Sequence, residues 1–178
     1  MQQGMEASSQ TQNLTAEQRE TAARIGGVVG TVAAVAGVPV SMLVIAGVLL
    51  FIFGTMLGAS VNFRQVFGVV AHAWLPSVFA SGAAVLVMFL KDPDDFDLKN
   101  PTGFNIGFYL PHSTPAWLVS LGSSIDVFSI WTVALMAVGI SACTSKTPLS
   151  KSLVITGTVW GIYIVAKGLF AIWMPAMA

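Results

Sequence analysis

The chain has 178 residues, of which 55% are hydrophobic and only 9% are charged, and its mean hydropathy is +0.79. Soluble domains carry about a quarter charged residues, so this composition excludes an ordinary soluble domain and indicates an integral membrane protein. Eight basic and eight acidic side chains balance, which removes the net positive charge that nucleic-acid binding needs. One cysteine and two histidines are too few for a structural zinc site, so neither a metal nor a cofactor is expected.

The N-terminal residues 1–24 are rich in Gln, Ser, Thr and Glu and are predicted to form a polar, mobile tail. They contain no apolar run of the kind that a signal peptide requires. Within this tail, Thr15 is followed three positions later by Gln18, the capping-box spacing that satisfies free N–H groups at a helix start. The spacing predicts that a helix begins near Thr15.

A run of 35 residues without an ionisable side chain, residues 25–59, comes next. As a helix it would be roughly 50 Å long, more than the roughly 30 Å hydrocarbon core but too short for two spans and a turn. One long helix is therefore predicted, with a membrane span at about residues 40–58. Pro39 removes a backbone hydrogen bond and is expected to kink this helix.

Three further apolar stretches predict spans at about residues 66–90, 117–142 and 152–173, with a Pro- and Gly-punctuated loop at 91–115. The four Asp residues of this loop lack the glycine and glutamate of an EF-hand, so they predict a solvated turn. The sequence thus predicts an all-α integral membrane bundle of about four transmembrane helices, occupying residues 25–178. The basic residues divide almost evenly between the two sides and leave the orientation open.

Two charged side chains fall well inside the predicted spans, Asp126 in the third and Lys167 in the fourth. In an antiparallel hairpin of these two spans, both residues lie at the same depth, because they are equally far from the turn centre between Lys146 and Thr147. A charge within a bilayer needs a partner or a watery cavity. An intramembrane ion pair is therefore predicted. A structural pair is favoured, in which Asp126 caps a local polar cluster with Ser123, Ser124 and Ser129, and a proton or ion relay is the alternative.

His72 could titrate near physiological pH and act as a sensor, although a packing role beside Trp74 is the preferred interpretation. Glycines also recur at a spacing of four residues, which leaves one face of a helix bare for close contact with another helix. Packing within the molecule is favoured and association between copies is the alternative for these pairs: Gly26 and Gly30, Gly54 and Gly58, and Gly157 and Gly161.

The order of several short motifs resembles the Yip1 family of multi-span membrane proteins, and is most similar to its bacterial members. The motifs are Phe63–Phe67, His72–Pro76 and the Asp-x-Phe-x-Ile-Trp core, within an overall resemblance over residues 60–173. The core carries Asp126, Phe128 and Trp131, and Pro76 ends the second motif. Family members typically have five spans, so the resemblance implies that this chain either begins after a first span or is naturally shorter.

The resemblance brings no catalytic residues, and the chain has no zinc-protease, phosphate-loop or nucleophile-elbow motif, so no enzyme is expected. It implies a multi-pass membrane scaffold or adaptor, located in the inner membrane if the source is bacterial. The expected partners are the lipid bilayer and other membrane proteins or a second copy. A small GTPase is expected as a partner only by analogy with eukaryotic relatives. A small transporter or channel component using Asp126, Lys167 and His72 is the alternative.

Overall fold

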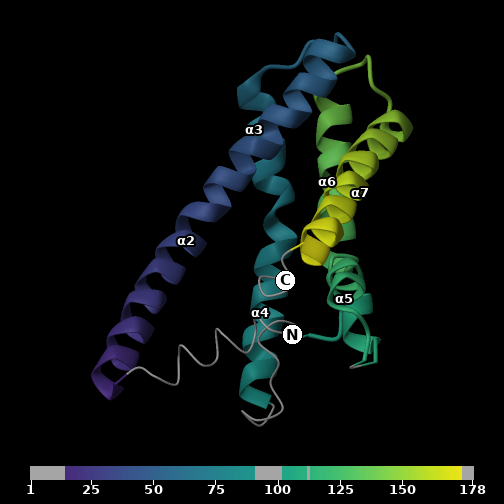
Figure 1. Cartoon of the computed structure of the whole chain (residues 1–178). Helices are drawn as coiled ribbons and strands as arrows, with labels where there is room; N and C mark the ends of the chain where they lie inside the picture. The colour runs from purple at the N-terminus through teal and green to yellow at the C-terminus, as the bar shows by residue number, and fades with distance from the viewer. Residues whose placement is uncertain (1–14, 91–101, 112, 174–178) are drawn as a thin grey trace. The chain divides into compact units, whose positions relative to one another are not determined.

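A computed structural model describes residues 15–90, 102–111 and 113–173, and its chain divides into two units, Met1–Val44 and Ile45–Ala178 (Figure 1). The described residues are almost entirely helical. An isolated antiparallel bridge joins Asn105 to Asp126, and no strand is assigned in these three ranges. The all-α prediction is confirmed. The acidic cluster of residues 92–97 and the first 14 residues of the predicted tail lie outside the described part of the chain.

The first unit is described from Thr15 and contains most of α2, Ala16–Leu50. The predicted capping box starts this helix: the Thr15 N–H donates to Gln18 Oε1 at 2.9 Å, and the Gln18 N–H donates to Thr15 Oγ1 at 3.3 Å. Residues 16–24 therefore belong to the helix, which corrects their assignment to a mobile tail. The box satisfies the N–H groups there, and the helix needs no apolar face to begin.

The predicted single long helix is confirmed, because α2 continues through Pro39 and passes directly into the π-helix η1, Phe51–Met56. The kink at Pro39 stays a prediction. The first unit does not bury its own apolar side chains: Val32 is 61% exposed and Val35 is 71% exposed. A helix that is apolar on its exposed surface is typical of a lipid environment.

The second unit is built around α6, Val127–Cys143, which packs against α3, Phe63–Ala73, α4, Leu75–Leu90, and α7, Leu149–Trp173 (Figure 1). Its buried apolar side chains come from the end of α2 and from η1, α3, α6 and α7, and the large ones that are fully buried include Leu49, Phe53, Val66, Val70 and Ile140. Hydroxyl side chains are buried as well: Ser120, Ser124, Thr147, Ser152 and Thr156. The outer surface is also apolar, as Val154 at 69% and Ile162 at 65% exposure illustrate.

Three segments of the described residues are long and apolar enough to cross a membrane: Arg24–Met56, Phe63–Leu90 and Leu149–Trp173. The second combines α3 and α4, which are separated only by Trp74. Pro76 lies in the first turn of α4, where its missing N–H removes no helical hydrogen bond. The structure therefore has several apolar helices compatible with a membrane bundle.

The third predicted span, residues 117–142, is not one continuous helix. It is divided into α5, Ala116–Ser123, and α6, whose 17 residues give about 25 Å of helix. The predicted loop before it also contains regular structure, the short 3-10 helix η3, Ile106–Tyr109, which packs on α5. Hydropathy missed the interruption because the residues on both sides of it are equally apolar.

Candidate functional site

The break between α5 and α6 is set by Asp126, which is the N-cap of α6. One carboxylate oxygen accepts the N–H groups of Phe128 at 2.9 Å and Ser129 at 3.0 Å, and the other accepts the Ser129 hydroxyl. Asp is among the best N-cap residues, because its side chain satisfies N–H groups that have no partner in the helix. A new helix therefore starts at this point within an otherwise apolar segment.

On the other side of the break, the last turn of α5 is closed by serine side chains. The hydroxyls of Ser123 and Ser124 both donate to the Ser120 carbonyl, at 3.2 and 2.8 Å. Ser120 and Ser124 are buried. Such local side-chain bonds compete with the backbone ladder of a helix and favour its end.

Lys167 of α7 reaches this same break. Its Nζ donates to Ser124 Oγ at 2.8 Å, and its charge interacts with that of Asp126. We call the residues at the break the polar cluster: Ser120, Ser123, Ser124, Asp126, Ser129 and Lys167. The structure thus brings the two predicted residues together, although the contacts of these two described side chains include no direct ion pair. The carboxylate is instead occupied by the start of α6, which is why the ammonium binds a serine hydroxyl.

The positions of the two charges match the dipoles of the two helices. Asp126 lies at the N-terminus of α6, where a negative charge is favourable, and Lys167 lies at the C-terminus of α5, where a positive charge is favourable. Each charge therefore compensates one of the helix ends that the break creates. This arrangement gives both residues a structural role that requires no ligand.

The segment before α5, around residues 104–107, is hydrogen-bonded to the backbone at the break. The Ile106 N–H donates to the Ile125 carbonyl and the Val127 N–H donates to the Phe104 carbonyl, each at 3.3 Å. Gly107 lies so close to α5 that an added Cβ would approach Ser123 N to 2.7 Å. Backbone atoms cannot move aside as side chains do, so only glycine fits there.

The residues of the Asp-x-Phe-x-Ile-Trp motif hold these elements together. Phe128 makes an edge contact with Phe104, with ring centroids 5.5 Å apart, and Trp131 stacks on Phe79 of α4 at 5.8 Å. Pro76, the last residue of the His72–Pro76 motif, is buried at the start of α4. In this structure the motif contributes a helix cap and aromatic packing between α6 and its neighbours.

His72 is exposed on α3, and its Nδ1 lies 2.7 Å from the Gly68 carbonyl. It lines a shallow apolar groove between α3 and α6, with these residues: Gly68, Val69, Ala73, Leu75, Leu135, Val138 and Gly139. It makes no contact with the polar cluster at the break. Its role as a pH sensor stays a prediction.

The predicted glycine pairs have few close neighbours within their own units. An added Cβ would meet no atom of its own unit within 4 Å at Gly26, Gly30, Gly157 and Gly161, and Gly58 forms a turn with φ of +61°, so close helix packing at these pairs stays a prediction. Of the six, Gly54 alone has neighbours, Leu50 and Val61. The glycines that do pack closely were missed: a Cβ at Gly139 would lie 2.5 Å from Val69, and one at Gly168 would lie 2.6 Å from Leu121.

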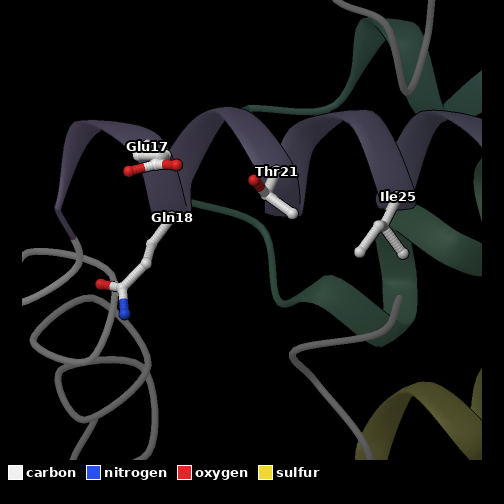
Figure 2. A pocket seen from close by; sticks show the side chains of 4 residues that line it. All are labelled: Glu17, Gln18, Thr21 and Ile25. Atoms are coloured by element: carbon white, nitrogen blue, oxygen red, sulfur yellow. The ribbon is translucent and has the colours of Figure 1, made fainter.

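A hollow at the start of α2 offers no comparable chemistry. Glu17, Gln18, Thr21 and Ile25 line it, all from the first turns of this one helix and all exposed (Figure 2). A surface formed by a single exposed helix does not enclose a ligand. Within the described ranges, no three His, Cys, Asp or Glu side chains come together in a way that could hold a metal ion.

Sequence reasoning found Asp126, Lys167 and a polar cluster of Asp126 with nearby serines, but it did not predict that these residues end one helix and start the next. A signal was present in the spacing: Ser120 and Ser124 are four residues apart, and Asp126 precedes Ser129 by three, as in an N-cap. These patterns predict a helix end and a helix start. In an apolar stretch of membrane length, they were outweighed by hydropathy.

Comparison with known proteins identifies the chain at the level of its family. The family model of the Yip1 domain matches residues 4–170, which is nearly the whole chain. No curated protein and no solved structure matches it. The match and the long apolar helices agree with the earlier resemblance, and we conclude that this chain is a membrane protein of the Yip1 family.

Proposed function

We propose that the protein is a non-enzymatic membrane scaffold that binds other membrane proteins, or a second copy of itself, through exposed helix faces. The observation that carries the proposal is the open face of α7 around Gly157 and Gly161. Within the second unit, no atom comes within 4 Å of a Cβ built at either position. In lipid, a face of small residues allows the backbone of another helix to approach closely.

The polar cluster supports a scaffold better than the alternative of a transporter. Asp126 caps α6 and Lys167 binds Ser124, so both charges are used to stabilise the helix break. A transport path usually needs titratable groups along its length. On the resemblance to bacterial relatives, we place the scaffold in a bacterial inner membrane, and any small GTPase partner rests on analogy alone.

Crosslinking in native membranes tests the scaffold. Leucine at both glycines, Gly157→Leu with Gly161→Leu, would fill the open face and should abolish crosslinked complexes of the full chain. Ala166→Leu is the matched control, because Ala166 is exposed on α7 but lies on another side of the helix from the two glycines. Complexes that persist in the double variant, or disappear in the control as well, would contradict the proposal.

A flux assay separates the scaffold from a transporter. Liposomes containing the protein should pass protons and small ions no faster than empty liposomes. Flux above that level, abolished by Asp126→Asn, would overturn the scaffold in favour of transport. The asparagine side chain can still cap α6, so loss of flux would reflect the lost charge and not a lost fold.

A further inference from the structure

Two turns of the second unit meet at one end of it, and a lysine joins them. Lys146, in the turn between α6 and α7, donates from Nζ to the Gly58 carbonyl at 2.7 Å. Gly58 ends the π-helix η1 in a left-handed conformation, with φ of +61°, that favours glycine. The ammonium therefore lies where a helix C-terminus favours a positive charge, and the turns before α3 and α7 are held side by side (Figure 1).

Two further basic residues at this end are exposed. Arg64 and Lys151 lie in the first turns of α3 and α7, and neither first turn contains an acidic residue. A positive charge at a helix N-terminus is unfavourable by itself, because the helix dipole and the free N–H groups there are also positive. The same arrangement becomes favourable when an anion binds.

The start of α7 has unused hydrogen-bonding capacity. Pro148 precedes the helix and has no side-chain acceptor for the first N–H groups. The hydroxyls of Thr147 and Ser152 are buried beside this turn and have no hydrogen-bond partner among the described residues. The sequence around Arg64, Lys146 and Lys151 also contains no acidic residue that could balance their charge. There is no Asp or Glu between Glu20 and Asp92, and none after Asp126.

The end of the second unit that carries Arg64, Lys146 and Lys151, here called the basic end, lies at the start of two candidate spans. Phe63–Leu90 and Leu149–Trp173 are candidate membrane spans, and Arg64 and Lys151 are their second and third residues. Side chains at the ends of a span lie at the level of the lipid headgroups. We propose that Arg64, Lys151 and the N-terminus of α7 bind the phosphate groups of anionic lipids, so that this end faces the more anionic leaflet. This inference rests on the second unit lying in a membrane, and it does not depend on the proposed scaffold function.

Lipid titration of the purified full chain tests this inference. Native mass spectrometry in detergent would measure the dissociation constants of phosphatidylglycerol and of zwitterionic phosphatidylcholine. The anionic lipid should bind more tightly, and Arg64→Gln and Lys151→Gln should each weaken its binding roughly fivefold, the effect of one basic residue at an anionic surface. Phosphatidylcholine binding should change little.

Arg24→Gln is the matched control. It also removes one positive charge from the end of a candidate span, but Glu20 lies one turn earlier on the same helix and offsets that charge. Equal losses in the control and the two test variants, or no loss in the test variants, would overturn the inference. Displacement of the lipid by millimolar inorganic phosphate would also overturn it, because the site would then bind free phosphate.

Discussion

At the scale of single residues, Asp126 explains why a chain of apolar helices keeps a carboxylate within a predicted span. Its two oxygens accept three hydrogen bonds from the first turn of α6, and its charge interacts with that of Lys167 nearby. A charged residue in lipid is costly unless it is paired or hydrogen-bonded. Here the cost is offset by the N–H groups that the break exposes, since these would otherwise be unsatisfied.

This role predicts different outcomes for two substitutions of Asp126. Alanine removes the cap and should lower the free energy of unfolding by about 1 kcal/mol, whereas asparagine keeps an acceptor for the same N–H groups and should cost less. Unfolding of the purified protein in mixed micelles would measure both values. Equal destabilisation by alanine and asparagine would show that the charge, and not the cap, is what α6 requires.

At the scale of elements, the helices could be predicted from the sequence much better than their interruptions. Hydropathy located the apolar segments, and the Thr15 capping box located the start of α2. The break at residues 124–126 was missed, because it depends on hydrogen bonds made by individual serine and aspartate side chains. The site was predicted in part: Asp126, Lys167 and the serines near Asp126 could be named from the sequence, whereas the hydrogen bond from Lys167 to Ser124 depends on how α5 and α7 pack.

The glycines illustrate the same limit. A spacing of four residues predicts a bare helix face but does not predict whether a neighbour covers it. Within the second unit, Gly157 and Gly161 have the spacing and no close neighbour, whereas Gly139 lies against Val69 without belonging to such a pair. Tertiary contacts between α3 and α6 decide which glycine is needed.

These contacts predict opposite effects for two alanine substitutions. Gly139→Ala would place its Cβ 2.5 Å from a methyl of Val69, and the branched valine has little room to yield, so we expect a loss of about 1–3 kcal/mol. Gly157→Ala meets no atom and gains helix propensity, so we expect a gain of up to about 1 kcal/mol. Both are measurable by unfolding in micelles. A Gly139→Ala variant as stable as Gly157→Ala would show that α3 and α6 do not pack this closely.

At the scale of the whole molecule, the second unit combines an apolar interior with an apolar exterior. Phe53, Val66 and Ile140 are fully buried, yet Val138 and Ile162 remain 50% and 65% exposed. A protein in water does not normally leave so much apolar surface uncovered. With lipid as the solvent, that surface needs no further partner, and the polar groups concentrate at the turns and at the break.

Cysteine accessibility tests this account most directly. In a Cys143→Ser background, Ile162→Cys would replace a side chain that is exposed but lipid-facing, and Ser145→Cys would mark an exposed position in the turn between α6 and α7. In proteoliposomes opened to both sides, a membrane-impermeant maleimide should label position 145 quickly and leave position 162 unmodified until detergent and denaturant are added. Rapid labelling of both positions in the intact bilayer would contradict a membrane-embedded bundle.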